Sequence, residues 1–556
     1  MNLNIKYISY ALLIWCFTAS SATSDNNAGS YLSAIHAERN NDFSSASKFY
    51  SLSLENDAYN VLLLNGAVRS NIKNGNFSDA LFFSKRLIKL KEEAPITSLL
   101  MLTTAIKNGE FNKAKLLLNE PNQFNIYLKA ILTGWLEIGA GNIGKGLNYF
   151  KESENAKKLG SISRNHLALA LAMVGDFEKA DAILSNFTNG SNLIDRESVI
   201  AHAQIMAQIG KNLEAVELLD RFLIGNDDLE ISKLRRLIDA GAPVKYDYIT
   251  NSKQGAALAL YTVANAINNE KDYALSLIYS RLVHHIDNKN IENILLISEN
   301  LLNLEQYKLT IENYNNVPNN HIKFKNAEIG RANALFFQGE EEGSIEVLIA
   351  LVRDNPKDIE LHTTLGNSLR RSEKFLEASI IYNEAILLIE NKGLKSWFEY
   401  YAKGICNERL GNWELAEVDF RKALAIEPNQ PSLLNYFGYS LVEKGIHLEE
   451  ALDLIKRAVR GQPNDGYITD SLGWALYRLE KYSEAVTHME RATELMPLDP
   501  IINDHLGDVY WAVDRHTEAE FQWRRALSFD PEEKDAKRIN KKLNIGLDAV
   551  LISETE

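Results

Sequence analysis

Two stretches near the C-terminal end of the sequence repeat one pattern at a fixed distance. DSLGWALYRLEKYSEA begins at residue 470 and DHLGDVYWAVDRHTEA begins at residue 504, so corresponding residues lie 34 apart (470 to 504). Both stretches carry Leu-Gly at their third and fourth positions, and both end in Glu-Ala. Such a period constrains the fold strongly, because each repeat is one supersecondary unit that must stack on its neighbours to bury its apolar face.

A spacing of 34 or 35 residues extends over four units from residue 391 onward, with the extra residue in the turn at Ile446-His447. Each unit has a glycine in its first predicted helix, alanines in its second, and a proline after the second helix. The glycines are Gly404, Gly438, Gly473 and Gly507, and the prolines are Pro428, Pro463, Pro497 and Pro531. A small residue lets two helices cross closely, and proline cannot continue a helix. The pattern therefore predicts pairs of antiparallel helices.

These units resemble the tetratricopeptide repeat, and weaker copies of the turn recur upstream at Gly75, Gly109 and Gly175. The resemblance implies an all-α fold, a right-handed superhelical solenoid of antiparallel helix pairs. The last four units are also similar to those of exported tetratricopeptide proteins of Gram-negative, especially α-proteobacterial, bacteria. We expect residues 532–556 to form a capping helix and tail, because a terminal repeat leaves an apolar face uncovered.

Breaks in the pattern divide the chain into six segments. Residues 225–254 interrupt the helical periodicity with Gly241, Pro243 and the alternating stretch VKYDYI, which is typical of extended chain. We expect this interruption to separate two parts of the solenoid. The expected segments are a signal peptide at 1–22, degenerate repeats at 23–224, the interruption at 225–254, middle repeats at 255–390, well-formed repeats at 391–531 and the cap at 532–556.

The first residues have the pattern of a secretory signal peptide. Lys6 precedes an apolar run from Tyr7 to Phe17, and small residues that include Ala22 follow it. The run is shorter than the roughly 20 residues that a membrane-spanning helix needs, so we expect cleavage after Ala22 rather than retention as an anchor. The resemblance to exported proteins then implies that the mature protein is located in the periplasm. It could associate with the outer membrane there, but the expected binding function does not require this association.

Cleavage would leave Cys406 as the only cysteine of the mature chain. An internal disulfide is then excluded. Cys406 lies two residues after Gly404, so we expect it to face the second helix of its own pair and to be buried.

Composition and motifs argue against several classes of function. The formal net charge is −14 and no long basic stripe precedes the last helix, so we expect no nucleic-acid partner. No two histidines lie three or four residues apart on a helix, and no glycine loop of the phosphate-binding kind follows a strand. We therefore expect no catalytic residues, no metal and no cofactor. Asp504 and Asp508 share a helical face. Two carboxylates at this spacing could perform acid–base catalysis or bind a cation, but we favour the interpretation that they form a solvated acidic surface.

The remaining candidate is the concave surface that the first helix of each unit lines in tetratricopeptide folds. The predicted groove residues are Asn435, Tyr439, Tyr467, Asp470, Trp474, Tyr477, Asp504, Asp508 and Trp511. Aromatic rings beside carboxylates suit an extended segment that bears Arg or Lys. We predict a non-catalytic scaffold that binds a protein or peptide in the cell envelope. A glycan-binding or enzyme-associated module of the envelope, whose rings stack on sugar, is the alternative.

Overall fold

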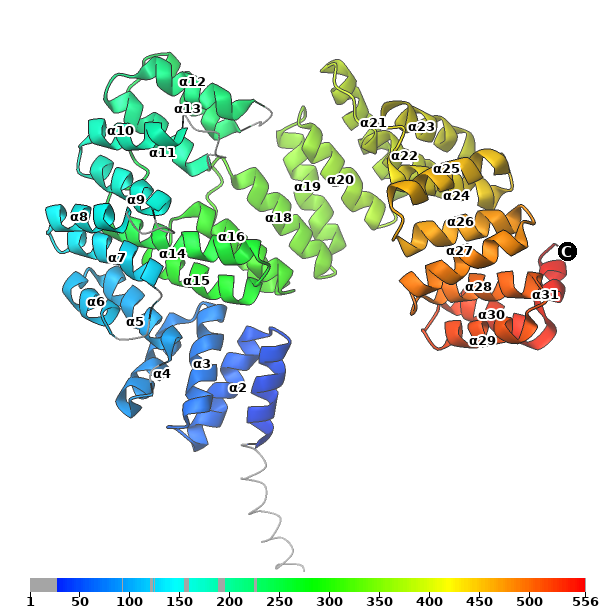
Figure 1. Cartoon of the computed structure of the whole chain (residues 1–556), viewed down its shortest axis with the longest axis horizontal. Helices are drawn as coiled ribbons and strands as arrows, with labels where there is room; N and C mark the ends of the chain where they lie inside the picture. Colours follow the sequence, from blue (N-terminus) through cyan, green and yellow to red (C-terminus); the bar gives the residue numbers. More distant parts are fainter. Residues whose placement is uncertain are drawn as a thin grey trace, which may run out of the picture. The chain divides into compact units, whose positions relative to one another are not determined.

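The computed structural model describes residues 28–92, 94–120, 124, 126–154, 160–188, 196–224 and 228–555. The predicted signal peptide lies outside them. Within these residues the regular elements are all helices, and none of those helices is long and apolar enough to cross a membrane. The predicted all-α class is confirmed. The chain divides into two compact units, Met1–Ser344 and Ile345–Glu556, and the boundary falls within α19 (Glu341–Asp354) (Figure 1).

Unit 1 begins with a series of helices in which each packs against the next. Residues 28–39 are helical. The helices that follow are α2 (Phe43–Asn56), α3 (Val61–Asn74), α4 (Phe77–Leu90), α5 (Pro95–Asn108), α6 (Phe111–Leu118), α7 (Ile126–Gly139), α8 (Ile143–Glu154), α9 (Gly160–Met173), α10 (Phe177–Thr188), α11 (Arg196–Gln208), α12 (Asn212–Leu223) and α13 (Leu229–Asp239). Gly75 and Gly109 end α3 and α5 in the left-handed conformation, with φ of 83° and 77°. Glycine adopts this conformation without steric cost, which explains the turn signature in the sequence.

After α13 the chain folds back on the start of unit 1. Residues 241–251 are not helical, and they lead into α14 (Ser252–Asn269) and α15 (Tyr273–Ile286). Helix α14 packs against α7, and α15 packs against α5 and α3 (Figure 1). Lys253 Nζ donates a hydrogen bond to the carbonyl oxygen of Lys107 at 2.7 Å, and Arg281 Nε donates one to that of Lys73 at 3.1 Å. The hairpin α14–α15 therefore covers one face of α3, α5 and α7.

Three further helices, α16 (Ile291–Asn303), α17 (Tyr307–Tyr314) and α18 (Phe324–Phe337), continue unit 1. The division between the units falls in α19 and not at the predicted interruption, residues 225–254. The reason is that the non-helical residues bring α14 back onto α7. Residues before and after the interruption, such as Trp135 and Leu260, consequently belong to one hydrophobic core.

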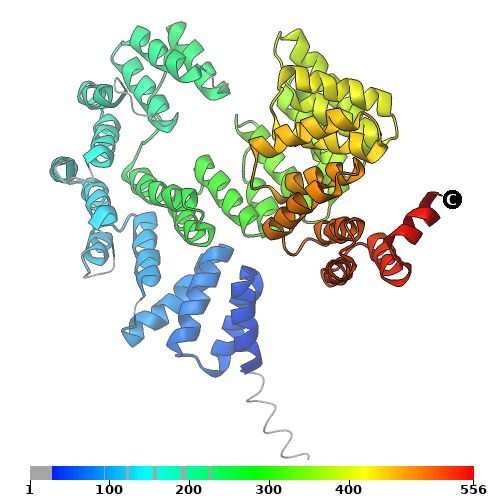
Figure 2. The same ribbon diagram turned by 45° about the vertical axis from the view of Figure 1, so that its right-hand side comes forward.

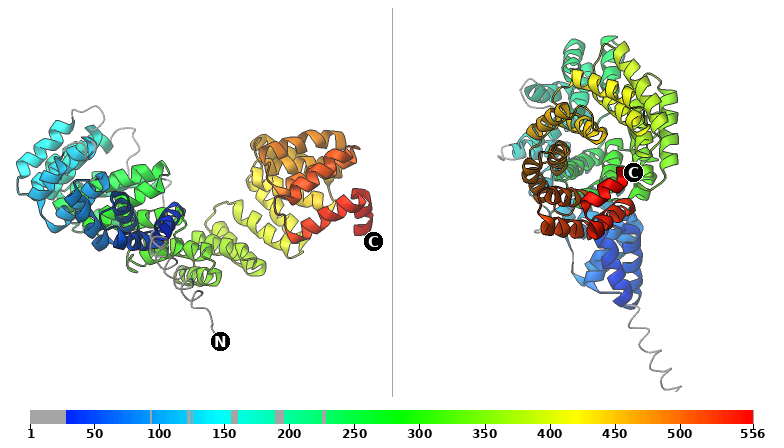
Figure 3. Two further views of the ribbon diagram at one scale, coloured as in Figure 1. Left: turned by 90° about the horizontal axis from the view of Figure 1, so that it is seen from below. Right: turned by 90° about the vertical axis from the view of Figure 1, so that its right-hand side faces the viewer.

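Unit 2 is a stack of antiparallel helix pairs that ends in two further helices (Figures 2 and 3). The pairs are built from α20 (Ile359–Arg371), α21 (Phe375–Asn391), α22 (Phe398–Arg409), α23 (Trp413–Ile426), α24 (Pro431–Lys444), α25 (Leu448–Gly461), α26 (Gly466–Arg478), α27 (Tyr482–Leu495), α28 (Pro500–Ala512) and α29 (His516–Leu527). The predicted cap is present as α30 (Glu533–Ile545), followed by α31 (Leu547–Thr555).

The glycines predicted at the helix crossings each face a large side chain. A Cβ atom on Gly473 would lie 2.7 Å from Met489, and one on Gly507 would lie 2.4 Å from Trp523. The alanines predicted on the second helices are fully buried; they are Ala416, Ala451, Ala485 and Ala519. The close crossing of the two helices therefore depends on a glycine paired with a large side chain, because a bulky residue of the second helix occupies the space that the glycine leaves.

Gly438→Ala tests this close packing. A Cβ atom at this position would lie 2.7 Å from Ile455 Cγ1 and 3.1 Å from the carbonyl oxygen of Ala451, so α24 and α25 must move apart. We expect the overpacking to lower the free energy of unfolding by about 1 to 3 kcal/mol. Hydrogen exchange should show the loss of protection concentrated in α24–α27, because each repeat is coupled mainly to its neighbours.

Gly343→Ala in α19 is the matched control. A Cβ atom there would lie 3.9 Å from Glu340 Oε2 and 4.0 Å from Leu335, so the substitution adds no clash. It should stabilise the chain by up to about 1 kcal/mol, because alanine restricts the unfolded state. Equal protection of α24–α27 in the two variants would contradict the proposed crossing.

Candidate functional site

Three helices of unit 2, α24, α26 and α28, carry all nine predicted groove residues. Helix α26 packs against both α24 and α28 (Figure 1). Their starts are well defined: Pro431 opens α24, Asp465 accepts a hydrogen bond from the amide of Ile468 at 3.1 Å, and Asp499 accepts one from the amide of Ile502 at 3.0 Å. Because the three helices start at equivalent positions, residues one repeat apart face the same side.

Trp474 is the centre of a row of stacked rings. The centroid of its indole lies 4.8 Å from that of Tyr477 at an interplanar angle of 14°, and 4.2 Å from that of His505 at 15°. Stacked pairs of this kind contribute roughly 0.5–1.5 kcal/mol each beyond the area they bury. The three side chains are partly exposed. We call Tyr477, Trp474 and His505 the aromatic row.

A carboxylate on the neighbouring helix holds Trp474 in place. Trp474 Nε1 donates a hydrogen bond to Glu443 Oε1 at 2.8 Å, and Arg478 lies 3.9 Å from the same oxygen. The Glu443 side chain is 47% exposed, so it can also meet a ligand. Burial and the adjacent Glu443 carboxylate raise the pKa of Tyr439, which therefore stays a neutral hydrogen-bonding group.

Asp470 faces His505 rather than solvent. His505 Nδ1 lies 3.1 Å from both carboxylate oxygens of Asp470, and the two side chains are only 12% and 9% exposed. Burial lowers the pKa of His505, but the carboxylate of Asp470, with those of Asp504 and Asp508, more than offsets it, and the pKa is raised above 6.5. An imidazolium–carboxylate pair thus fixes the His505 ring within the aromatic row.

The prediction that Asp504 and Asp508 line an open groove is wrong. Lys542 of α30 donates hydrogen bonds to both carboxylates, at 2.8 Å to Asp504 and 2.6 Å to Asp508, and its own side chain is fully buried. The two aspartates are 8% and 1% exposed. Arg538 lies 3.5 Å from Asp508 and 3.8 Å from Asp504. Two cations of the cap therefore neutralise the pair, which is not a solvated acidic surface either.

The same cluster connects three helices. Asp508 also accepts a hydrogen bond from Trp523 Nε1 at 2.9 Å, and Trp523 is the side chain that packs on Gly507. Burial and the adjacent Asp508 carboxylate raise the pKa of Asp504 against the opposing effect of Lys542. The cluster consequently ties α28 to α29 and α30.

Trp511 contacts the cap rather than the aromatic row. Its Nε1 donates a hydrogen bond to Asp548 of α31 at 3.1 Å, and its ring stacks on His516 at 4.1 Å. Gly546, between α30 and α31, has a φ of 80°, and a Cβ atom there would lie 2.9 Å from the indole. The backbone of the cap thus approaches Trp511 closely, so this residue is unavailable as a second open aromatic wall.

Tyr467 and Asn435 lie outside the aromatic row. Tyr467 is 56% exposed and precedes Trp474 by two helical turns, about 10 Å along α26. Asn435 is partly buried, and its side-chain oxygen has no hydrogen-bond partner among the described residues. Both stay predictions as partner contacts.

Sequence reasoning missed Glu443, His505 and Lys542. The position of His505, 35 residues after Asp470 (470 to 505), is one repeat period plus one, so a pair between neighbouring helices could have been considered. Lys542 follows Ile539 by three residues and therefore shares the apolar face of the last helices. The spacing to Ile539 thus indicated a buried position for Lys542, although a charged side chain is normally expected at the surface.

The residues described around the aromatic row are suited to stacking and hydrogen-bond contacts. Cys406 is buried, as expected, and burial raises the pKa of its thiol to about 11, so it is a poor nucleophile near neutral pH. Groups of three or more His, Cys, Asp or Glu side chains that could hold a metal ion are absent from the described residues. The stacked rings of the aromatic row can bind a ligand, and the Glu443 carboxylate can select for a positively charged one.

Lys542→Met should destabilise the end of unit 2. The substitution leaves Asp504 and Asp508 buried without their central cation, and removing one partner of a buried ion pair costs about 3 kcal/mol or more. We expect faster hydrogen exchange throughout α28–α31. Lys541→Met is the control, because Lys541 is exposed and its ammonium donates a hydrogen bond to Ser553 Oγ at 2.6 Å rather than to a buried carboxylate. Similar exchange in both variants would show that the cluster does not hold the cap.

The His505–Asp470 pair predicts a pH dependence. Because the pKa of His505 is raised in the folded protein, its contribution to stability is complete below about pH 6.5 and is lost as pH rises through the folded value. Asp470→Asn should therefore lower the free energy of unfolding more below pH 6.5 than well above it, and NMR titration should give a lower pKa for His505. A pH-independent effect of the substitution would contradict the charged pair.

Comparisons with known proteins bear on these repeats. A family model described as tetratricopeptide repeat matches residues 471–533. A tetratricopeptide repeat-containing protein of Pseudomonas aeruginosa is 34% identical over 98 residues, which are 17% of this chain and 17% of that protein. The probable peptide N-acetylglucosaminyltransferase SPINDLY of Solanum lycopersicum is 30% identical over 101 residues, 18% of this chain and 10% of that protein. The match thus spans less than a fifth of either relative.

A solved structure with a similar arrangement is the Cut9–Hcn1 hetero-tetramer of the APC/C. It is 15% identical, covers 86% of this chain and 95% of that chain, and gives a TM-score of 0.38. Residues 471–533, which match the tetratricopeptide repeat model, carry the whole aromatic row and the two aspartates that bind Lys542. Arrays of this family generally present binding surfaces to other proteins.

Proposed function

We propose that this protein is a non-catalytic scaffold that binds a segment of a partner protein across α24, α26 and α28. The observation that carries the proposal is the aromatic row. Its rings are partly exposed, and their orientation is set by Glu443 and Asp470 before any ligand arrives. Pre-oriented aromatic side chains are the residues that most often dominate the energy of an interface, because little conformational freedom is lost when they bind.

The charge of this surface favours a segment that bears Lys or Arg. The cap neutralises Asp504 and Asp508, and His505 pairs with Asp470, so Glu443 is the half-exposed carboxylate beside the row. A cationic side chain beside the row would reach the half-exposed carboxylate of Glu443 for a charge-assisted hydrogen bond. The net charge of −14 would speed the approach of a basic partner.

We further propose that the scaffold acts in the periplasm, as a mature chain that begins at Thr23. The support for this location is the pattern of residues 1–22, with its short apolar run and small residues before the cleavage point. The search for a binding partner should therefore begin with proteins of the cell envelope.

Trp474→Ala should weaken partner binding most. Loss of the central ring should cost about 2 kcal/mol, or roughly 30-fold in affinity. Glu443→Gln keeps an acceptor for Trp474 Nε1 but removes the charge, so it should chiefly slow association and reduce the salt dependence. The partner is first captured from an envelope extract with the immobilised wild-type protein. Calorimetric titrations of the purified partner at two salt concentrations then compare the variants.

Phe521→Ala is the matched aromatic control. Phe521 lies on α29, is 63% exposed and has no part in the aromatic row, so its loss should leave the affinity unchanged. Wild-type affinity in Trp474→Ala would contradict the proposal. Quenching of tryptophan fluorescence by an envelope oligosaccharide, abolished in Trp474→Ala, would favour the glycan-binding alternative instead.

A further inference from the structure

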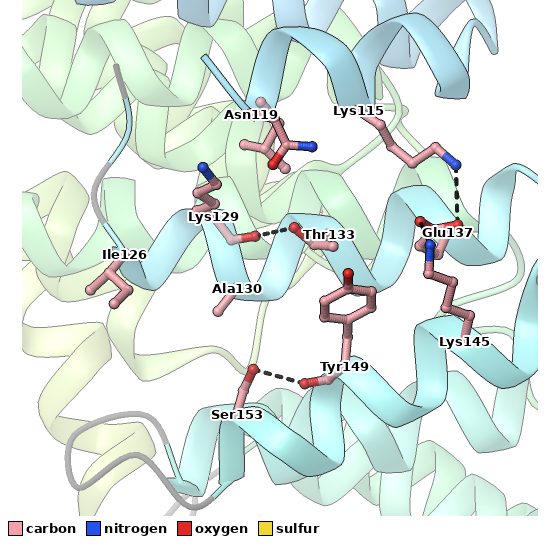
Figure 4. A pocket seen from close by; sticks show the side chains of 11 residues that line it. Lys115, Asn119, Ile126, Lys129, Ala130, Thr133, Glu137, Lys145, Tyr149 and Ser153 are labelled. Carbon is pink, nitrogen blue, oxygen red and sulfur yellow. Dashed lines mark hydrogen bonds and ion pairs between the residues drawn. The ribbon is translucent and has the colours of Figure 1, made fainter. Parts of the chain in front are cut away.

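Unit 1 contains a pocket of about 370 Å³ between α6, α7 and α8 (Figure 4). Three lysines and one glutamate are its charged lining residues: Lys115, Lys129, Lys145 and Glu137. The excess of positive charge is notable in a chain whose net charge is −14. The predicted groove residues all lie in unit 2, so the pocket is separate from the proposed binding surface.

Glu137 is fully engaged by its neighbours. It is 4% exposed, and its carboxylate accepts hydrogen bonds from Lys145 at 2.8 Å, from Asn142 at 2.8 Å and from Lys115 at 3.1 Å (Figure 4). Burial alone would raise the pKa of Glu137, but these hydrogen bonds hold it at about 2, so the group stays ionised. One buried carboxylate thus positions two ammonium groups, and the pocket keeps an excess of two positive charges.

Lys129 and Tyr149 have polar ends that are not used within the described part of the chain. The ammonium of Lys129 forms no ion pair there, and the hydroxyl of Tyr149 forms no hydrogen bond there, although both side chains line the pocket and are partly buried. They lie on facing helices, Lys129 on α7 and Tyr149 on α8 (Figure 4). Each of these groups can donate a hydrogen bond to an anionic oxygen.

The same pocket has an apolar wall. Leu118, Ile126 and Ala130 line it beside the lysines, and Ile126 is 81% exposed. A free phosphate would leave this wall in contact with water. A peptide that alternates acidic and apolar side chains would use both parts of the lining.

The pocket lies on the side of α7 that a partner can reach. Thr133 and Glu137 line it, whereas Trp135, two residues from each, packs against Gly255 of α14. Two residues correspond to about 200° around a helix, so α14 covers the opposite side of α7.

We infer that this pocket binds an acidic segment of a partner protein, with a Glu or Asp carboxylate at the ammonium of Lys129 and a neighbouring apolar side chain against Ile126 and Ala130. The lysines held by Glu137 supply the surrounding positive potential. The site is independent of the aromatic row, and it selects the opposite charge.

Fluorescence anisotropy of the mature chain with a labelled hexapeptide of alternating glutamate and leucine tests the inference. A peptide with glutamine in place of glutamate is the matched probe. We expect the glutamate peptide to bind at least about tenfold more tightly, because charge-assisted hydrogen bonds are lost with the carboxylates. Lys129→Gln should weaken binding about tenfold, and Tyr149→Phe should weaken it severalfold without changing the fold.

Lys113→Gln is the control variant. Lys113 lies on α6 near the pocket-lining Lys115, but it is exposed and pairs with Glu110 at 2.8 Å, so the affinity should not change. Equal affinity of the two peptides, or no effect of Lys129→Gln, would overturn the inference. Inorganic phosphate that displaces the glutamate peptide at an equal concentration would also overturn it, since the pocket would then take a bare anion. Trp474→Ala should bind this peptide like the wild type, which separates this test from that of the proposed function.

Discussion

Each of the well-formed helix pairs of unit 2 depends on a close crossing, in which a glycine of the first helix lies against a large side chain of the second. At the last pair this contact extends into the cap. Trp523, which packs on Gly507, donates a hydrogen bond to Asp508, and Asp508 binds the buried Lys542. Because a buried carboxylate is costly without a cation, α30 contributes to the stability of the last repeat and is more than a solvating cover.

The cap also decides which part of unit 2 can select a ligand. Asp504 and Asp508 face two cations of α30, so this part of α28 offers little net charge. His505 still joins α28 to the aromatic row through its contact with Trp474 and its pair with Asp470. In the proposed function, recognition is therefore centred on α24 and α26, and the proposed preference for a basic segment depends on Glu443 rather than on the aspartates.

Repetition explains which features could be predicted. The crossing glycines, the buried alanines and the helix pairs recur every 34 or 35 residues, so their pattern is visible in one sequence. The Trp474–Glu443 hydrogen bond does not recur from repeat to repeat, so it leaves no periodic pattern in the sequence. The return of α14 onto α7 brings together residues as far apart as Lys107 and Lys253, and no local pattern reports such a contact. Lys542 is buried only because its carboxylate partners lie on another helix.

The two units use the same helix pairs but leave different faces open. In unit 1 the hairpin α14–α15 covers α3, α5 and α7, as an added helix covers a groove in a complex. A partner of unit 1 must then approach α7 from the side of α6 and α8, where the lysine-lined pocket lies. In unit 2 the aromatic row stays partly exposed beside Glu443. If both proposed sites bind, a basic and an acidic segment would not compete, because each is repelled by the charge of the other's site. One chain could therefore hold two dissimilar partners at once.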